Sequence, residues 1–408
     1  MGYQQHAVAG FSWQSLQKII TAGLSFAKIF VLARLLTPEQ FGLFSLIMIT
    51  LGTTESVTQT GVNVTILQSK QPVRYFLDTA YVIAIIRGLV IGSLMVAMGY
   101  FMAQYYQEPE LFPMITVISL VPIIKGFINP AIVSWQKNFH FAKDSSYHLL
   151  RLLVEALAQI ALAWWLQSVW ALVLGIIISA AFEVFLSFVM LAERPVFHYI
   201  KSRGSQILHN ARWLSASSLL NYLNDNLDDF LLGKVFGTHQ LGIYHNAYAL
   251  SHKANYEFSK SAYHGVAPIF NRLVQDREES RLRRAFFKTM FSTLLLVTGI
   301  SLPLLIWPET LIVWFLGQNW LAAAAILPWL TLAGIIHSLA NIMYALLIAK
   351  KHYIYLNTHL LVNVVLMIVG IIYLGNRYGF QGAIMGVLLA RLVALPIIIL
   401  GAHKALRS

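Results

Sequence analysis

The sequence predicts an all-α integral membrane protein of about twelve transmembrane helices. Of its 408 residues, 58% are hydrophobic and only 11% are charged, whereas roughly a quarter of the residues in an ordinary soluble domain are charged. Apolar runs long enough to span a bilayer, about 20 residues each, recur along the whole chain. Short polar or basic segments separate these runs. The composition therefore excludes a soluble globular fold and leaves no room for a large soluble domain beside the helices.

The first half of the chain contains six apolar segments that we expect to cross the membrane. The first of them is too long for a signal peptide and has no small-residue cleavage site, so we expect it to stay in place as a helix. The six segments cover residues 8–34, 39–67, 77–103, 111–135, 146–166 and 169–192.

The second half repeats the first. A shift of 200 residues superimposes Gln40–Phe44 on Gln240–Tyr244. An even number of spans in each half makes the halves parallel repeats, related by an axis along the membrane normal. We therefore predict an N-terminal lobe, residues 1–200, and a C-terminal lobe, residues 201–408. The spans of the second lobe cover residues 205–233, 240–268, 285–307, 321–349, 353–375 and 379–403.

The positive charges indicate the topology. If the N-terminus is cytoplasmic, 19 of the 29 Lys and Arg residues lie in or beside inside segments, and outside loops hold only Arg34, Lys234 and Arg377. The positive-inside rule then places both termini in the cytoplasm. The net charge of +12 is explained by this distribution, so we expect no nucleic acid partner.

Polar residues inside the first and seventh spans recur every three or four positions. Such spacing puts them on one face of a helix, which should not face lipid. The two faces correspond under the 200-residue shift. A hydrated cavity is one interpretation, and hydrogen bonds between neighbouring helices are the other. The residues are Gln14, Lys18, Thr21, Ser25 and Lys28 in the first span, and Ser218, Asn221, Asp225 and Asp228 in the seventh.

The eighth span is the most polar. Lys253, Glu257, Lys260 and His264 follow one another at intervals of four, three and four residues. We expect this face to line a cavity, although an ion pair between Lys253 and Glu257 within the helix is the alternative.

Three further cations lie centrally in apolar spans, namely Arg87, Lys125 and Arg391. Charges in the membrane cost several kcal/mol unless they are paired, hydrated or extended to an interface. Ligand binding is one interpretation of these cations. Pairing with a carboxylate such as Glu55, Glu155 or Glu183 is the other.

Several kinds of chemistry have no support in the sequence. The chain has no Cys, which excludes disulfides, thiolate metal sites and a Cys nucleophile. His245, His252 and His264 lack the companion ligands of a zinc site. No Gly-rich nucleotide motif is present. We expect no metal, no cofactor and no built-in ATPase.

Four stretches give the sequence a family resemblance over nearly its whole length. They are Ala33–Phe44, Gln104–Leu111, Leu214–Phe230 and Leu316–Trp320. With them the chain resembles the bacterial Wzx-type oligosaccharide flippases of the multidrug/oligosaccharidyl-lipid/polysaccharide exporter superfamily. The resemblance implies two six-helix lobes that form a V around a central cavity. It also implies location in the bacterial cytoplasmic (inner) membrane and a polyprenyl-diphosphate-linked glycan as cargo, used for O-antigen, capsule or exopolysaccharide.

A diphosphate cargo would need cations in a medium of low dielectric constant. Lys18, Lys253 and Lys260 are the first candidates to contact it. Arg87, Lys125 and Arg391 are ranked second.

Two further roles concern the transport cycle. Lys28 and Asp228 correspond under the 200-residue shift and carry opposite charges, so we predict that they form an outer gate. Glu55 and Glu183 are candidates for coupling transport to H⁺ or Na⁺, a choice that the sequence leaves open.

Two other functions compete with glycan flipping. A small-molecule antiporter of the same superfamily would use intramembrane carboxylates to bind its coupling ion. A membrane glycan polymerase or ligase would need a sizeable outer loop with reactive residues, and the predicted outer loops are short. We therefore expect a transporter and not an enzyme, with a lipid-linked glycan and membrane lipids as its partners.

Overall fold

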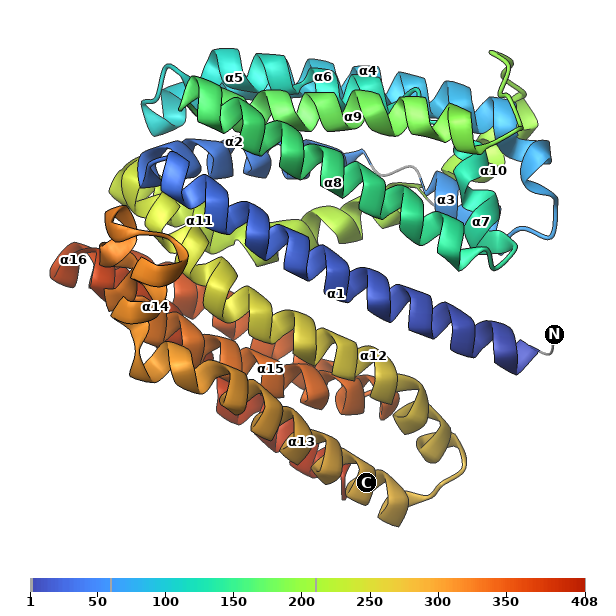
Figure 1. Ribbon diagram of the computed structural model, residues 1–408. Helices are drawn as coiled ribbons and strands as arrows, with labels where there is room; N and C mark the ends of the chain where they lie inside the picture. Colours follow the sequence, from blue (N-terminus) through green and yellow to red (C-terminus); the bar gives the residue numbers. More distant parts are fainter. Residues whose placement is uncertain (1–2, 59–60, 210, 408) are drawn as a thin grey trace. The chain divides into compact units, whose positions relative to one another are not determined.

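The computed structural model describes residues 3–58, 61–209 and 211–407, and all the regular structure in these ranges is helical (Figure 1). The contacts divide the chain into two compact units, residues 1–226 and 227–408. The boundary between lobes at residues 200 and 201, which the duplication suggests, stays a prediction.

Unit 1 is a bundle of long helices joined by short ones. Helix α8 packs against both α9 and α1, and α4 packs against α5 and α6. The elements are α1 (Tyr3–Leu35), α2 (Pro38–Val57), α3 (Val62–Gln68), α4 (Val73–Tyr106), α5 (Leu111–Ile118), α6 (Leu120–Lys125), η1 (Pro130–Ile132), α7 (Val133–Lys137), α8 (Phe141–Leu166), α9 (Trp170–Met190), α10 (Lys201–Leu208) and the start of α11 (Ala211–Tyr248).

The repeated motif around Gln40 begins helix α2 and connects two turns. Thr37 and Gln40 form a capping box, in which each side chain accepts a hydrogen bond from the other residue's backbone N–H. Pro38 occupies the first helical turn, where its missing N–H costs nothing. The Gln40 amide also donates to the carbonyl of Gln167 at 3.0 Å, which ties this turn to the turn between α8 and α9.

Two of the predicted spans in unit 1 are broken. The span at 39–67 bends by 47° between α2 and α3, and the span at 111–135 bends by 65° before η1. Gly61, with φ of 66°, starts α3 in the left-handed conformation that glycine adopts readily. At the second break the Asn129 side chain accepts from the N–H of Ala131 and begins η1. Hydropathy alone does not reveal such bends, because both arms are apolar.

Unit 2 packs α12, α13, α15 and α16 against one another (Figure 1). A π-helical turn interrupts the helix that follows the bend of α11 at Gly237, whose φ is 81°. The elements after α11 are η2 (Ala249–Lys253), α12 (Ala254–Gln275), α13 (Glu279–Ile306), α14 (Pro308–Phe315), η3 (Gln318–Ala325), α15 (Leu327–Ala349) and α16 (Tyr353–Ala405).

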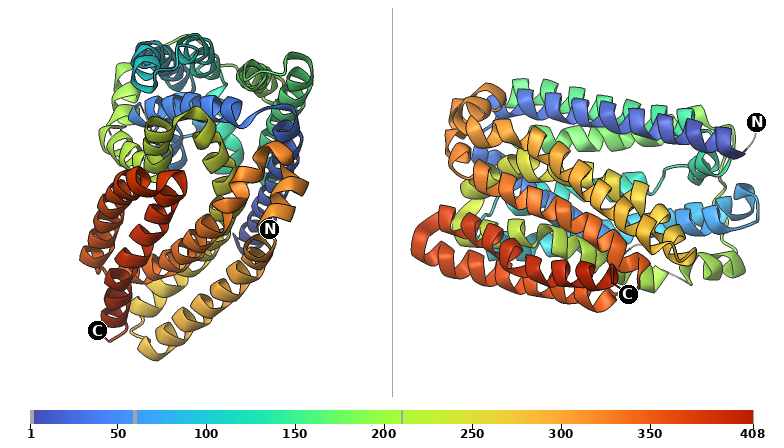
Figure 2. Two further views of the ribbon diagram at one scale, coloured as in Figure 1. Left: turned by 90° about the vertical axis from the view of Figure 1, so that its left-hand side faces the viewer. Right: turned by 90° about the horizontal axis from the view of Figure 1, so that it is seen from below.

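Helix α16 is long enough for two spans. Its 53 residues would measure about 80 Å as a straight helix, far more than a bilayer core. Gly379, with φ of 68°, turns the chain back, and the two halves lie side by side (Figure 2). Gly370 and Gly386 let the halves touch, since a Cβ on Gly386 would lie only 2.5 Å from the Gly370 carbonyl carbon.

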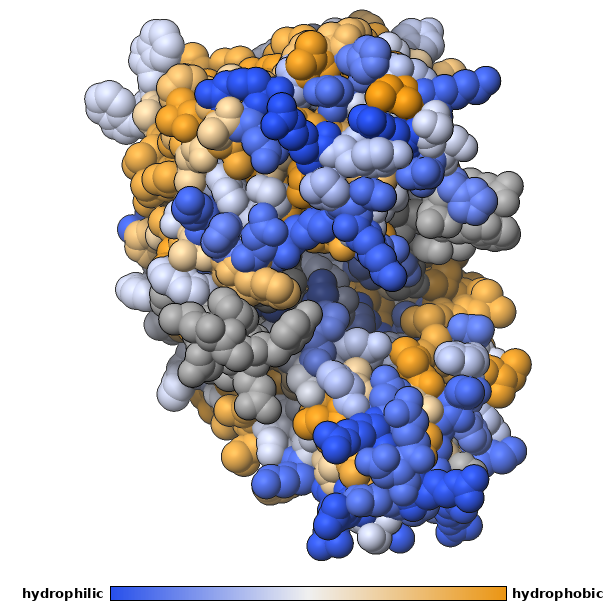
Figure 3. All heavy atoms as spheres, turned by 90° about the vertical axis from the view of Figure 1, so that its right-hand side faces the viewer, coloured by the Kyte–Doolittle hydropathy of each residue, from blue (hydrophilic) through white to orange (hydrophobic). Residues whose placement is uncertain are grey.

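The surface has the features of a protein that contacts lipid. Within the described residues six helices are long and apolar enough to span a membrane, or up to eight if each bent pair counts as one span. Large apolar side chains point outward, among them Trp164 and Trp165, which are 74% and 77% exposed. Hydrophilic residues gather on the end seen in Figure 3. Each of the twelve predicted segments overlaps helical structure among the described residues, while the count of twelve spans stays a prediction.

Candidate functional site

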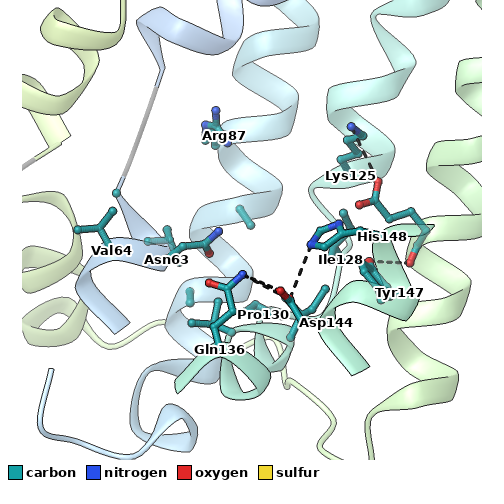
Figure 4. Close-up of a pocket in the computed structure, with 17 residues that line it drawn as sticks. Asn63, Val64, Arg87, Lys125, Ile128, Pro130, Gln136, Asp144, Tyr147 and His148 are labelled. Atoms are coloured by element: carbon teal, nitrogen blue, oxygen red, sulfur yellow. Dashed lines mark hydrogen bonds and ion pairs between the residues drawn. The ribbon is translucent and has the colours of Figure 1, made fainter. Parts of the chain in front are cut away.

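Unit 1 contains a polar cavity of about 480 Å³ beside both broken spans (Figure 4). Its walls come from the first residues of α3, the middle of α4, the end of α6, the η1–α7 segment and the facing sides of α8 and α9. The volume lies within the range of roughly 300–1,000 Å³ that is usual for small-molecule sites. Discontinuous helices are also where transporters commonly bind their substrates.

Asp144 forms one wall of this cavity together with two neighbours. The Gln136 amide donates to both Asp144 carboxylate oxygens at 3.3 Å. His148 lies one turn further along α8, with Nε2 3.7 Å from Asp144 Oδ1. Asp144 is only 8% exposed, so these neighbours hold its carboxylate in a fixed orientation. Figure 4 shows the three side chains facing one another.

Glu183 and Lys125 form another part of the lining. Lys125 Nζ lies 3.8 Å from Glu183 Oε2, which is too long for a hydrogen bond. Glu183 Oε2 is buried and has no hydrogen-bond partner among the described residues. The Tyr147 hydroxyl donates to the backbone carbonyl of Glu183 at 3.0 Å and fixes α9 at this point. One carboxylate oxygen in the wall is therefore left with unused acceptor capacity.

Arg87 also lines the cavity, but its guanidinium is used by the fold. Its Nε donates to the carbonyl of Thr58 at 2.8 Å, and its Nη2 donates to the carbonyl of Glu55 at 3.3 Å. These carbonyls belong to the C-terminal end of α2, where the helix offers no partner. Lys137 does the same for the end of α3, donating to the carbonyls of Ile66 and Ser69 at 2.9 Å. Arg87 thus satisfies carbonyls at the break, and Lys137 satisfies carbonyls at the far end of the short helix that follows it.

A chain of alternating charges connects the cavity to helix α1. Lys28 Nζ lies 2.7 Å from Glu155 Oε1, and the other oxygen of Glu155 lies 2.9 Å from Arg151. Arg151 Nε in turn lies 3.9 Å from Glu183, which faces Lys125. Three cations and two carboxylates on α1, α8, α9 and α6 therefore alternate, and each has a neighbour of opposite charge. Pairing of this kind removes most of the cost of charges in a span.

The formal charges that line the cavity cancel. Arg87 and Lys125 contribute two positive charges, and Asp144 and Glu183 contribute two negative charges. The cavity therefore offers hydrogen-bond donors and acceptors without a strong field of either sign.

Unit 2 has a second polar region, which is more tightly packed. Asp228 is 4% exposed and accepts a hydrogen bond from the Tyr244 hydroxyl. Arg391 Nη1 donates to the carbonyl of Ala333 at 3.1 Å. The aspartate and the arginine are thus held by neighbours in their own unit.

Imidazole and amide groups continue this region. His252 Nε2 and His337 Nδ1 lie 3.1 Å apart, and His252 stacks on Tyr248 with ring centroids 4.4 Å apart. Further along, the Asn255 amide donates to Ser301 at 2.9 Å, and Asn341 donates to Ser259 at 2.9 Å. Such neutral contacts join α12 to α13 and α15.

The structure distributes the predicted site residues over both units. Lys18 and Lys260 are exposed on their helices, and the Lys260 ammonium lies 5.6 Å from the centre of the Tyr256 ring. The polar residues predicted on one face of the first and seventh spans differ in burial. Thr21, Ser25 and Ser218 are half-buried, and Asn221 and Asp225 are exposed. The side chains of Gln14, Lys253 and Glu257 lie outside the described part of the structure. The roles of all these residues stay predictions.

The members of the predicted gate have partners within their own units, as Lys28 pairs with Glu155 and Asp228 with Tyr244. The gate itself stays a prediction. Glu55 is half-buried, and its backbone carbonyl accepts from Arg87.

Sequence reasoning missed the wall formed by Asp144, Gln136 and His148. A signal was present, because Asp144, His148, Arg151 and Glu155 follow at intervals of four, three and four, which places them on one helix face. The predicted span began at residue 146 and left Asp144 in a loop. Helix α8 in fact begins at Phe141.

Known proteins of similar sequence come from surface-polysaccharide biosynthesis. The chain is 23% identical to the lipopolysaccharide biosynthesis protein WzxC of Escherichia coli (strain K12) over 395 residues, covering 96% of this chain and 80% of that protein. It is 25% identical to the teichuronic acid biosynthesis protein TuaB of Bacillus subtilis (strain 168) over 301 residues, covering 72% of this chain and 61% of that protein.

Solved structures of similar fold are membrane transporters. The lipid II flippase MurJ in an inward closed conformation superimposes with a TM-score of 0.68 at 13% identity, covering 96% of this chain and 88% of that one. An inward-facing multidrug resistance MATE transporter of the MOP superfamily gives a TM-score of 0.67 at 12% identity and covers 98% of both chains. At these identities the likeness shows the fold, which is that of an integral membrane protein.

The family model described as "Polysaccharide biosynthesis protein" matches residues 31–325. The match includes the whole cavity of unit 1, whose lining runs from Gly61 to Glu183. It also extends well into unit 2. This protein is therefore a member of the polysaccharide biosynthesis protein family.

Proposed function

We propose that this protein is an alternating-access transporter that flips a polyprenyl-diphosphate-linked oligosaccharide from the cytoplasmic to the periplasmic leaflet of the bacterial inner membrane. Membership in the polysaccharide biosynthesis protein family carries the proposal. The likeness to the lipid II flippase MurJ is consistent with it, since a protein named as a flippase shares the fold. The flipped glycan would serve O-antigen, capsule or exopolysaccharide assembly.

The cargo's diphosphate requires cations, and Lys18, Lys253 and Lys260 are our candidates. Lys18 and Lys260 are exposed side chains on long helices, so a phosphate can approach them. Phosphate binding to Lys acts through a point charge, which is strengthened where water is excluded. Arg391 is a weaker candidate, since it already donates to Ala333.

Deletion of the gene in its own host tests the proposal. Lipid-linked glycan should accumulate and surface polysaccharide should disappear, and the intact gene should restore export. Lys18→Ala and Lys253→Ala should each fail to restore it at normal protein abundance. Lys70→Ala, an exposed change at a predicted loop, serves as the control. Normal surface polysaccharide in the deletion strain would refute the function.

The topology that accompanies the proposal has both termini and the loop at 194–204 in the cytoplasm. The distribution of Lys and Arg supports it. A reporter fused after residue 204 should report a cytoplasmic location, and one fused at 104–110 a periplasmic one. If an ion gradient drives export, an ionophore that collapses the gradient of the coupling ion should lower export. Ionophores for H⁺ and for Na⁺, tested separately, therefore identify the coupling ion.

A multidrug antiporter is the second candidate, because a MATE transporter shares the fold to the same degree. The two TM-scores, 0.67 and 0.68, do not separate the functions. The family match favours the glycan. Increased drug susceptibility of the deletion strain with unchanged surface polysaccharide would favour the antiporter.

A further inference from the structure

The cavity of unit 1 is poorly suited to a phosphate. Asp144 and Glu183 place two carboxylates in its wall, and like charges repel strongly where the dielectric constant is low. Arg87 donates to two backbone carbonyls at the end of α2. A phosphate that took Arg87 would leave these carbonyls without partners, at a considerable cost.

The cavity is instead suited to a ligand that carries hydroxyl groups. Glu183 Oε2 is buried without a hydrogen-bond partner among the described residues, and a hydroxyl can donate to it. Lys125 lies beside it and is 36% exposed at its side chain, so its ammonium can donate to a hydroxyl or ring oxygen. Elsewhere in the lining, Asp144 offers acceptor sites and Asn63 offers an amide.

The apolar part of the lining complements these polar groups. Ile128, Pro130, Ile132 and Val133 also line the cavity. A pyranose ring presents C–H groups on its faces and hydroxyls at its edge, so one ring can use both kinds of wall. The volume of about 480 Å³ equals that of about sixteen water molecules, at roughly 30 Å³ each. This is enough for one or two sugar rings.

We propose that the cavity between α3, α4, α6, α8 and α9 is a glycan subsite, in which Glu183, Lys125, Asp144 and Gln136 hold a sugar ring of the cargo through its hydroxyls. The inference rests on the proposed function and assigns recognition of the sugar and of the diphosphate to different residues. Unit 1 would thereby select cargo by its sugars, while exposed lysines such as Lys18 bind the part that all polyprenyl-linked glycans share.

The absence of Cys from the chain permits a direct test. Asn63→Cys places a single thiol in the cavity wall. Gln68→Cys places one on the same helix, exposed and outside the cavity lining. The rate of maleimide labelling is measured for the purified full-length protein in nanodiscs. Three probes are compared: lipid-linked glycan extracted from the deletion strain, the same glycan released from its lipid by mild acid, and undecaprenyl diphosphate without sugar.

Intact glycolipid and released glycan should slow labelling of Asn63→Cys at least severalfold and leave Gln68→Cys unchanged. Undecaprenyl diphosphate should protect neither thiol. Protection of Asn63→Cys by undecaprenyl diphosphate alone would show a phosphate site and overturn the subsite. Protection of both thiols to the same degree would show a general conformational change and would also overturn it.

A binding measurement with two variants separates the sugar from the diphosphate. Gln136→Ala and Glu183→Gln should each weaken binding of the intact glycolipid about tenfold. Gln136→Ala removes the amide that orients the Asp144 carboxylate. Glu183→Gln replaces the charged acceptor of a sugar hydroxyl with a neutral one. Binding of undecaprenyl diphosphate should not change. Equal weakening for both lipids would contradict a sugar-specific role, as would no weakening for either. Thermal unfolding of each variant shows whether it is folded, and Gln136→Ala keeps every ion pair of unit 1 intact.

Failure of the subsite and failure of the function give different results. If wild-type protein flips the intact glycolipid in proteoliposomes and no probe protects Asn63→Cys, the function stands and the subsite is wrong. If wild-type protein flips no glycolipid, the proposed function fails and the subsite fails with it.

Discussion

The two units bury their polar groups in different ways. Unit 1 uses formal charges, and its chain from Lys28 through Glu155 to Lys125 joins four helices. Unit 2 also buries the carboxylates of Asp228 and Asp229, but the contacts that join η2 and α12 to their neighbours use amides, hydroxyls and imidazoles, such as the pairs Asn255–Ser301 and His252–His337. Both arrangements satisfy polar groups inside apolar helices, but the free-energy cost of losing a partner differs between them. A charge that loses its partner costs far more than an amide that does so.

The difference extends to packing. Beside the charge chain of unit 1 lies a cavity of about 480 Å³. In unit 2, Gly334 packs directly on the same polar groups, since a Cβ there would lie 3.0 Å from the Cα of His252 and 3.1 Å from the Asn255 amide nitrogen. Unit 1 therefore keeps its polar groups around a space that a ligand can fill, whereas these polar groups of unit 2 serve to join helices.

The largest effect is expected when the charge chain is cut at its centre. Glu155→Ala removes the partner of Lys28 and the nearer of the two partners of Arg151, and stranding a buried charge typically costs about 3–5 kcal/mol. The thermal unfolding midpoint of the protein in nanodiscs should fall steeply, and its abundance in the membrane should drop. Glu110→Ala, an exposed change with no capping bond, should have little effect. Equal midpoints for the two variants would show that unit 1 does not depend on its charges.

In unit 2 we expect a change in close packing to lower stability more than the loss of a neutral hydrogen bond. Gly386→Ala would push a methyl group against the Gly370 backbone, 2.5 Å from its carbonyl carbon, and backbone cannot move aside as a flexible side chain can. Overpacking of this kind costs roughly 1–3 kcal/mol. Gly299→Ala is the matched control, because nothing lies within 4 Å of its added Cβ. A midpoint for Gly386→Ala as high as that of the control would contradict the close packing of the α16 hairpin.

The sequence predicted the helical segments well because the length of an apolar run determines whether it can cross a bilayer. It did not predict the breaks. The apolar pattern continues from 39 to 67 although the helix stops at Val57 and restarts at Val62. Tertiary contacts accompany this break, since Arg87 supplies donors to the carbonyls of Glu55 and Thr58 at the end of α2.

The candidate site was predictable only in part. Pairing with a carboxylate such as Glu55, Glu155 or Glu183 was one interpretation of Lys125, whose Nζ lies 3.8 Å from Glu183 Oε2; its role in ligand binding stays a prediction. Which charges would surround a cavity was not predictable, because helical periodicity assigns residues to a face without identifying what the face contacts. Asp144 was missed for a simpler reason, as a charge near a span end is ordinarily assigned to a loop.

A smaller effect is expected from the neutral network of unit 2. Asn255→Ala removes an amide that bonds to Ser301 and lies against Gly334. Side-chain hydrogen bonds between membrane helices average about 0.6 kcal/mol and reach about 1.7 kcal/mol. The unfolding midpoint should therefore fall clearly less than for Glu155→Ala, with exposed Asn376→Ala as the control. A loss as large as that of Glu155→Ala would remove the distinction between charged and neutral networks.

The smallest effect on stability is expected at the end of the charge chain that reaches the cavity. Lys125 is 36% exposed at its side chain and lies 3.8 Å from Glu183, and an exposed ion pair contributes only about 0–1 kcal/mol. Glu183 also keeps Arg151 as a neighbour, at 3.9 Å. Lys125→Gln should therefore leave the unfolding midpoint nearly unchanged.

Export should nevertheless fall in Lys125→Gln, because the ammonium that faces the cavity is replaced by a neutral and weaker donor. Comparison with Lys28→Gln separates the two ends of the chain. Lys28 makes a 2.7 Å contact with Glu155 and does not line the cavity, so its loss should lower the midpoint more. If Lys125→Gln lowers the unfolding midpoint as much as Lys28→Gln, Lys125 has a structural role like the other members of the charge chain. If it changes neither the midpoint nor export, the cavity end of the chain has no part in transport.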